Sequence, residues 1–71
     1  MNPYDAESGS VWVYEKDTRE EEYFVVLDGY SRNVYGEHAG NPFRRHLSLK
    51  DGIASWFACE SHMNYKSVRV T

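Results

Sequence analysis

The residues best suited to chemistry are Cys59 and His62, which stand three positions apart. A thiolate and an imidazole are ligands that zinc binds in tetrahedral sets, and His38 and His46 could complete such a set on paper. A structural zinc site normally shows two closely spaced pairs, whereas this sequence has one. We therefore expect no metal and no other cofactor, and we interpret Cys59 as a structural thiol.

Catalysis also finds little support in the residue pattern. Cys59 and His62 are close in sequence, but this spacing supplies neither a base at hydrogen-bond distance nor an oxyanion hole. The acidic run of Glu20, Glu21 and Glu22 could do acid or base work only in a cleft. On the tip of a hairpin it has no apolar pocket to raise a pKa. We predict that the protein is not an enzyme and that the acidic run contacts a partner.

Aromatic and basic residues offer a binding function instead. Arg44 and Arg45 form a basic pair in a predicted loop, which suits the rim of an interface or a phosphate contact. The aromatic residues of the predicted strands exceed what one covered sheet face needs, so some of them are expected to form an interface. The candidate partner-binding residues are Trp12, Tyr14, Glu20, Glu21, Glu22, Tyr30, Tyr35, Arg44 and Arg45.

The elements that must position these residues are short strands. β-branched and aromatic residues dominate 10–16 and 21–27, and in both segments the alternation places apolar side chains on two faces. Asp28 and Gly29 suit a tight turn, after which 30–36 reads as a returning strand. Alternation across 65–70 predicts a short final strand.

A helix is predicted over 47–59. Leu49, Ile53, Trp56 and Phe57 fall within one arc at helical spacing, and Ser48 resembles an N-cap. Asp51, three residues after Ser48, resembles a capping-box partner. We expect Trp56 to lie in the core beneath this helix and Trp12 to lie on the opposite sheet face.

The predicted fold class is α+β. Residues 1–9 read as a flexible arm, and 10–71 as a single domain. The domain is an antiparallel three-stranded meander followed by one helix and a short C-terminal strand, with the helix packed on one sheet face.

Three short segments resemble the YegP-like family of small proteins. They are Tyr-Phe-Val-Val-Leu at 23–27, Asn-Val-Tyr-Gly-Glu at 33–37 and Gly-Ile-Ala-Ser at 52–55. The resemblance spans Glu22 to Trp56, about half of the chain. It implies a three-stranded meander followed by one helix, and it implies that single units dimerise.

Composition narrows the functions further. The 71 residues carry a net charge of -3, which argues against non-specific nucleic-acid binding because such binding needs Lys and Arg to neutralise phosphates. No apolar run approaches the roughly 18 residues of a spanning helix, and no signal peptide is evident. We expect a cytoplasmic protein without a membrane role.

The leading hypothesis is a small non-enzymatic protein-protein interaction module that forms a homodimer through its sheet. A more specific form is an accessory protein of a phage or mobile element, which inhibits a host protein by presenting acidic residues to a basic groove. The alternative is single-stranded nucleic-acid binding through an aromatic sheet face, assisted by Arg44 and Arg45.

Overall fold

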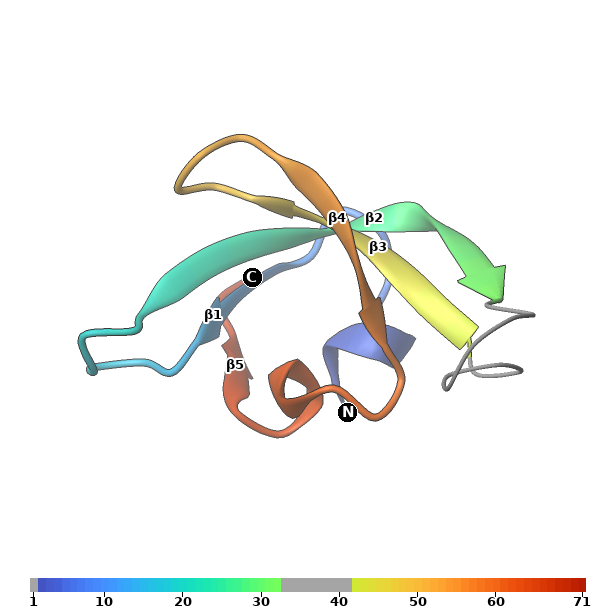
Figure 1. Cartoon of the computed structure of the whole chain (residues 1–71). Coiled ribbons are helices and arrows are strands. Elements are labelled where there is room, and N and C mark those ends of the chain that lie inside the picture. Colours follow the sequence, from blue (N-terminus) through green and yellow to red (C-terminus); the bar gives the residue numbers. More distant parts are fainter. Residues whose placement is uncertain (1, 33–41) are drawn as a thin grey trace.

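A computed structural model describes residues 2–32 and 42–71 (Figure 1). It contains five strands joined in one antiparallel sheet of order β4-β3-β2-β1-β5, with two single-turn 3-10 helices. In chain order the elements are η1 (Pro3–Asp5), β1 (Val11–Tyr14), β2 (Glu22–Arg32), β3 (Pro42–Ser48), β4 (Ala54–Ala58), η2 (His62–Asn64) and β5 (Ser67–Arg69).

The first four strands form a meander, and the last strand, β5, pairs with the first, β1. Strands β1 to β4 pair in sequence, and η2 then leads the chain back so that β5 pairs with β1. Figure 1 shows η1 and η2 on the same side of the sheet. We call this side the inner face and the opposite side the outer face.

The main buried cluster lies on the inner face, while Val13, which is 2% exposed, is buried on the outer face. Alternation along β1 and β2 places Trp12 opposite Phe24, and these side chains pack with Val26 and Ala6. All four are at most 3% exposed. Tyr14 and Met63 pack against the same cluster, and Met63 belongs to η2. The η segments therefore complete a core that a single small sheet could not bury alone.

The predicted helix over 47–59 is absent, and the α+β prediction is wrong. Among the described residues the helical elements are the two 3-10 turns, while this segment forms the end of β3, a turn and β4. The predicted core helix is replaced by a β-hairpin. The helix that the YegP-like resemblance implies is likewise not found in this segment.

The hairpin turn explains why helix signals misled. Gly52 adopts φ of +72° and donates to the carbonyl of Ser48 at 2.9 Å, and Ser48 donates to the carbonyl of Ile53 at 3.1 Å. The Asp51 carboxylate accepts from the Ile53 amide at 3.0 Å. Ser48 Oγ accepts from the Lys50 amide at 3.3 Å. The Ser and Asp side-chain oxygens that can cap a helix therefore close a turn here, because they bond local amides in either setting.

Asp28 and Gly29, predicted as a tight turn, lie inside β2 instead. Gly29 has φ of +112°, and the pairing with β3 shifts register between Val26 and Tyr30. Such an irregularity bends a strand without ending it. Residues 30–32 extend β2, and the rest of the predicted strand 30–36 lies outside the described residues.

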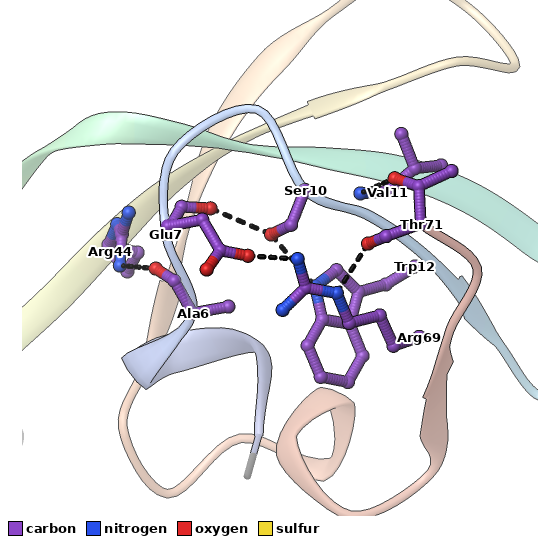
Figure 2. Close-up of polar contacts among 8 residues, drawn as sticks. All are labelled: Ala6, Glu7, Ser10, Val11, Trp12, Arg44, Arg69 and Thr71. Carbon is purple, nitrogen blue, oxygen red and sulfur yellow. Dashed lines mark hydrogen bonds and ion pairs between the residues drawn. The ribbon is translucent and has the colours of Figure 1, made fainter.

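The predicted arm packs on the sheet. Pro3 and Ala6 are buried, and the Tyr4 amide donates to Asn64 Oδ1 at 3.0 Å, which joins the first helical turn to the second. Figure 2 shows the following stretch, where Ser10 Oγ donates to the Glu7 carbonyl at 2.7 Å. Residues 2–9 therefore belong to the folded unit.

Within residues 2–32 and 42–71, no helix is long and apolar enough to cross a membrane.

Candidate functional site

The outer face carries apolar side chains on all five strands. The strand registers align Val68, Val13 and Tyr23 in one row and Val25, Leu47 and Ala54 in the next. Trp56 and its register partner Arg45 lie beside the second row. We call the seven of these residues that are at least partly exposed the outer patch: Tyr23, Val25, Arg45, Leu47, Ala54, Trp56 and Val68. Val13, in the middle of the first row, is 2% exposed and is not part of the patch.

Several large side chains of the outer patch are open to solvent. Trp56 is 46% exposed, Tyr23 is 41% exposed and Val68 is 52% exposed. Both 3-10 helices of the described chain lie on the inner face, so neither covers these residues (Figure 1). An aromatic and aliphatic sheet face left open in this way is typical of a binding surface.

Trp56 is held in place across the sheet. The Arg45 guanidinium carbon lies 6.0 Å from the centroid of the Trp56 ring, within the range of a cation–π contact. The ring extends toward β2, since a Cβ placed on Gly29 would lie 4.0 Å from Trp56 Cη2. These contacts limit the motion of the indole, and a preordered aromatic side chain loses less entropy on binding.

The two tryptophans occupy the reverse of their predicted places. Trp12 is 3% exposed, and its indole Nε1 donates to Ser10 Oγ at 3.0 Å (Figure 2). It lies in the core and offers no contact surface. Tyr14, half-buried on the inner face, packs against the same core. Trp56, predicted as core, is the exposed residue.

The two arginines separate to opposite faces. Arg44 is 3% exposed on the inner face, where it donates to the carbonyls of Leu27, Tyr4 and Ala6 at 2.8 to 2.9 Å. It ties the N-terminal segment to β2. Arg45 is exposed on the outer face. The predicted loop around this basic pair is strand β3, which places successive side chains on alternate faces.

The three glutamates of the acidic run also lie in different surroundings. Glu20 and Glu21 are exposed in the connection between β1 and β2, where Glu21 Oε2 accepts from the Asp17 amide at 2.9 Å. Glu22 begins β2 and accepts from Ser48 Oγ at 2.9 Å. Glu20 and Glu21 therefore remain candidates for a partner contact. Glu22 also links β2 to β3 through its hydrogen bond with Ser48.

The remaining candidates are the tyrosines. Tyr30 lies in β2 opposite Arg44, and nothing is described of its side chain. Tyr35 lies outside the described residues.

A pocket opens on the inner face, lined by Tyr14, Glu22, Phe24, His46 and Met63. Its volume is about 250 Å³. Ligand pockets typically measure about 300 to 1,000 Å³, so this one is small for a cofactor or substrate. His46 Nδ1 is buried without a partner, and burial lowers the pKa of this imidazole although the charge of Glu22 opposes the shift.

The suggested zinc ligands do not assemble in the described part of the chain. Cys59 is a free, exposed thiol and His62 is exposed. Among the described residues, no group of three or more His, Cys, Asp or Glu side chains could hold a metal ion. His38 lies outside those residues.

Sequence reasoning missed that Leu47, Ala54 and Trp56 share one sheet face. The available signal was period-two alternation, since Arg45 and Leu47 share one face of β3, and Ala54 and Trp56 share the same face of β4. The helical interpretation of 47–59 hid this alternation.

The fold and this surface define a class: a small antiparallel β-sheet protein with one covered and one partly exposed sheet face. Comparison with protein-family models, with curated proteins and with solved structures found no match. The resemblance to the YegP-like family stays a prediction.

Proposed function

We propose that the protein is a small non-enzymatic module that binds a protein partner through the outer patch. The observation that carries this proposal is the exposure of Trp56, Tyr23 and Val68 on a single sheet face. Aromatic residues and arginine are enriched at the centres of protein interfaces, and the outer patch combines both in the Trp56–Arg45 contact.

Charge favours a protein partner over a nucleic acid. The nucleic-acid hypothesis relied on two arginines beside an aromatic face, but Arg44 is buried and bonded to backbone carbonyls. Arg45 then remains as the basic residue of the outer patch, and the chain carries a net charge of -3. Single-strand binders combine base stacking with a positively charged groove, and the second condition is not met by this patch.

The exposed acidic residues support a partner with basic groups at its rim. Glu20 and Glu21 lie in the turn that leads into β2, near the end of the strand that carries Tyr23. A partner with an apolar centre and a basic edge would match both features, and such charge complementarity raises association rates.

Trp56→Ala tests the proposal. We expect partner affinity to fall about thirtyfold, because loss of an interface aromatic commonly costs about 2 kcal/mol. The circular dichroism spectrum should be unchanged, since the indole is 46% exposed. The measurement is quantitative affinity capture of partners by immobilised protein, read by mass spectrometry and then by titration with the partner identified.

Tyr65→Ala is the matched control. Tyr65 is 68% exposed but lies between η2 and β5, outside the outer patch. Its replacement should leave capture intact. Equal capture by the wild type and by Trp56→Ala, with both folded, would reject the outer patch as the binding surface.

A further inference from the structure

The outer edge of β4 is unlike the other edge of the sheet. In the described chain the sheet ends at β4 on one side and at β5 on the other. β5 has three residues, includes Arg69 and follows Lys66. β4 has the sequence Ala-Ser-Trp-Phe-Ala, without a charge, proline or glycine. Natural edge strands usually carry such residues to prevent pairing, so β4 is an unprotected edge.

The hydrogen-bond phase of β4 identifies which backbone groups face this edge. Because Ser48 donates to the Ile53 carbonyl, the alternating pattern directs the backbone groups of Ser55 and Phe57 toward β3. Those of Ala54, Trp56 and Ala58 then point outward. The Ala58 carbonyl fits this phase, since it accepts from the Ser61 amide and from Asn64 Nδ2, both at 3.0 Å.

We propose that β4 pairs antiparallel with β4 of a second copy of the chain, about a two-fold axis at Ser55. Ala54 of each copy then exchanges backbone hydrogen bonds with Trp56 of the other, and the two sheets become continuous. This inference goes beyond the proposed partner binding and does not rest on it, because it uses the backbone of the β4 edge.

Three features favour a second copy in this register. An axis at Trp56 would pair Ala54 with Ala58, whose carbonyl already accepts two hydrogen bonds. An axis at Ser55 uses only the open positions. The small Ala54 side chain stands beside Trp56 of the other copy on the outer face, which leaves room for the indole.

Charge also permits self-pairing. Residues 53–58 carry no ionisable side chain, so an antiparallel pair of these strands places no like charges opposite each other. The two outer patches then lie side by side on one face of the joined sheet.

The proposal predicts a specific cross-link. Ser55 would face Ser55 of the other copy as a non-hydrogen-bonded pair, with Cα atoms about 4.5 Å apart, which a disulfide can span. In a Cys59→Ser background, Ser55→Cys should form a covalent dimer under mild oxidation at least tenfold faster than Lys50→Cys, whose residue is exposed in the turn. Equal rates for the two variants would overturn the proposal.

Sedimentation velocity of the unmodified chain provides the second test. The wild type should form a dimer, and Ala54→Pro should be a monomer with an unchanged circular dichroism spectrum. Proline removes an amide that points to the open edge and so breaks no bond to β3. Ala54→Val keeps the amide and should remain dimeric.

A wild type that stays monomeric across the concentration range overturns the proposal, as does dimerisation of folded Ala54→Pro. If Ala54→Pro does not fold, the cross-linking rates decide the question alone. A monomer that binds extended peptides at this edge would identify a different occupant and also overturn it. Trp56→Ala leaves the β4 backbone unchanged, so it should lose partner capture and remain a dimer, and the two proposals can fail separately.

Discussion

Trp12→Ala should unfold the protein. Trp12 is 3% exposed and packs with Phe24, Val26 and Ala6, the buried cluster that joins the sheet to the N-terminal segment. Truncating a buried tryptophan costs about 3 to 5 kcal/mol, and the whole stability of so small a domain is of about that size. We expect loss of the cooperative urea transition, followed by circular dichroism.

Trp56→Ala is the control for the same measurement. Trp56 is 46% exposed, so its truncation should lower the free energy of unfolding by less than about 1 kcal/mol. If Trp56→Ala unfolds the chain and Trp12→Ala does not, the assignment of inner and outer faces is reversed.

Arg44→Met should have the second largest effect. The guanidinium donates to the carbonyls of Tyr4 and Ala6 in the N-terminal segment and to that of Leu27 in β2. A hydrogen bond from a charged group contributes about 1.5 to 3 kcal/mol, and its loss leaves buried carbonyls without this donor. We expect destabilisation of about 3 kcal/mol or more in urea unfolding, together with faster amide exchange in residues 4–6.

Arg45→Met is the matched control, because it makes the same substitution one residue away on the outer face. It should change the free energy of unfolding by less than about 1 kcal/mol. Similar losses for the two variants would show that Arg44 does not anchor the N-terminal segment.

Much of the sheet could be predicted from the sequence because alternation is a local signal. Strands were expected over 10–16, 21–27 and 65–70, and these ranges contain β1, residues 22–27 of β2, and β5. The alternation within 21–27 places Phe24 and Val26 opposite to Tyr23, and the first two are buried while Tyr23 is exposed. A segment in which β-branched and aromatic residues alternate with period two has few stable structures other than a β-strand.

The hairpin of β3 and β4 could not be predicted in the same way. Leu49, Ile53 and Trp56 fit a helical arc, yet Leu49 and Ile53 flank the turn and are exposed. Asp51 and Gly52 were the signal for a hairpin, since glycine adopts the positive φ that this turn needs. When a short segment fits both the helical and the strand period, its structure is set by tertiary pairing. Here β3 pairs with β2, and β4 pairs with β3.

Trp12 and Trp56 were predicted on the wrong faces of the sheet because of that error and because of a second one. The side of a sheet that becomes the core depends on which side is covered, and here the cover includes η1 and η2. Residues 1–9 were expected to be a flexible arm because they have no hydrophobic period. Residues 2–9 pack on the sheet with the help of Arg44, which bonds the carbonyl of Tyr4 forty residues away along the chain, and no local pattern reveals such a contact.

Acrylamide quenching of single-tryptophan variants tests most directly the claim that one sheet face forms the core and the other is open for binding. Trp12→Phe leaves Trp56 as the fluorophore, and Trp56→Phe leaves Trp12. We predict a quenching constant several times larger for the protein that retains Trp56, because that indole is 46% exposed whereas Trp12 is 3% exposed. Equal constants in two folded variants, or stronger quenching of Trp12, would contradict the assignment of the outer patch.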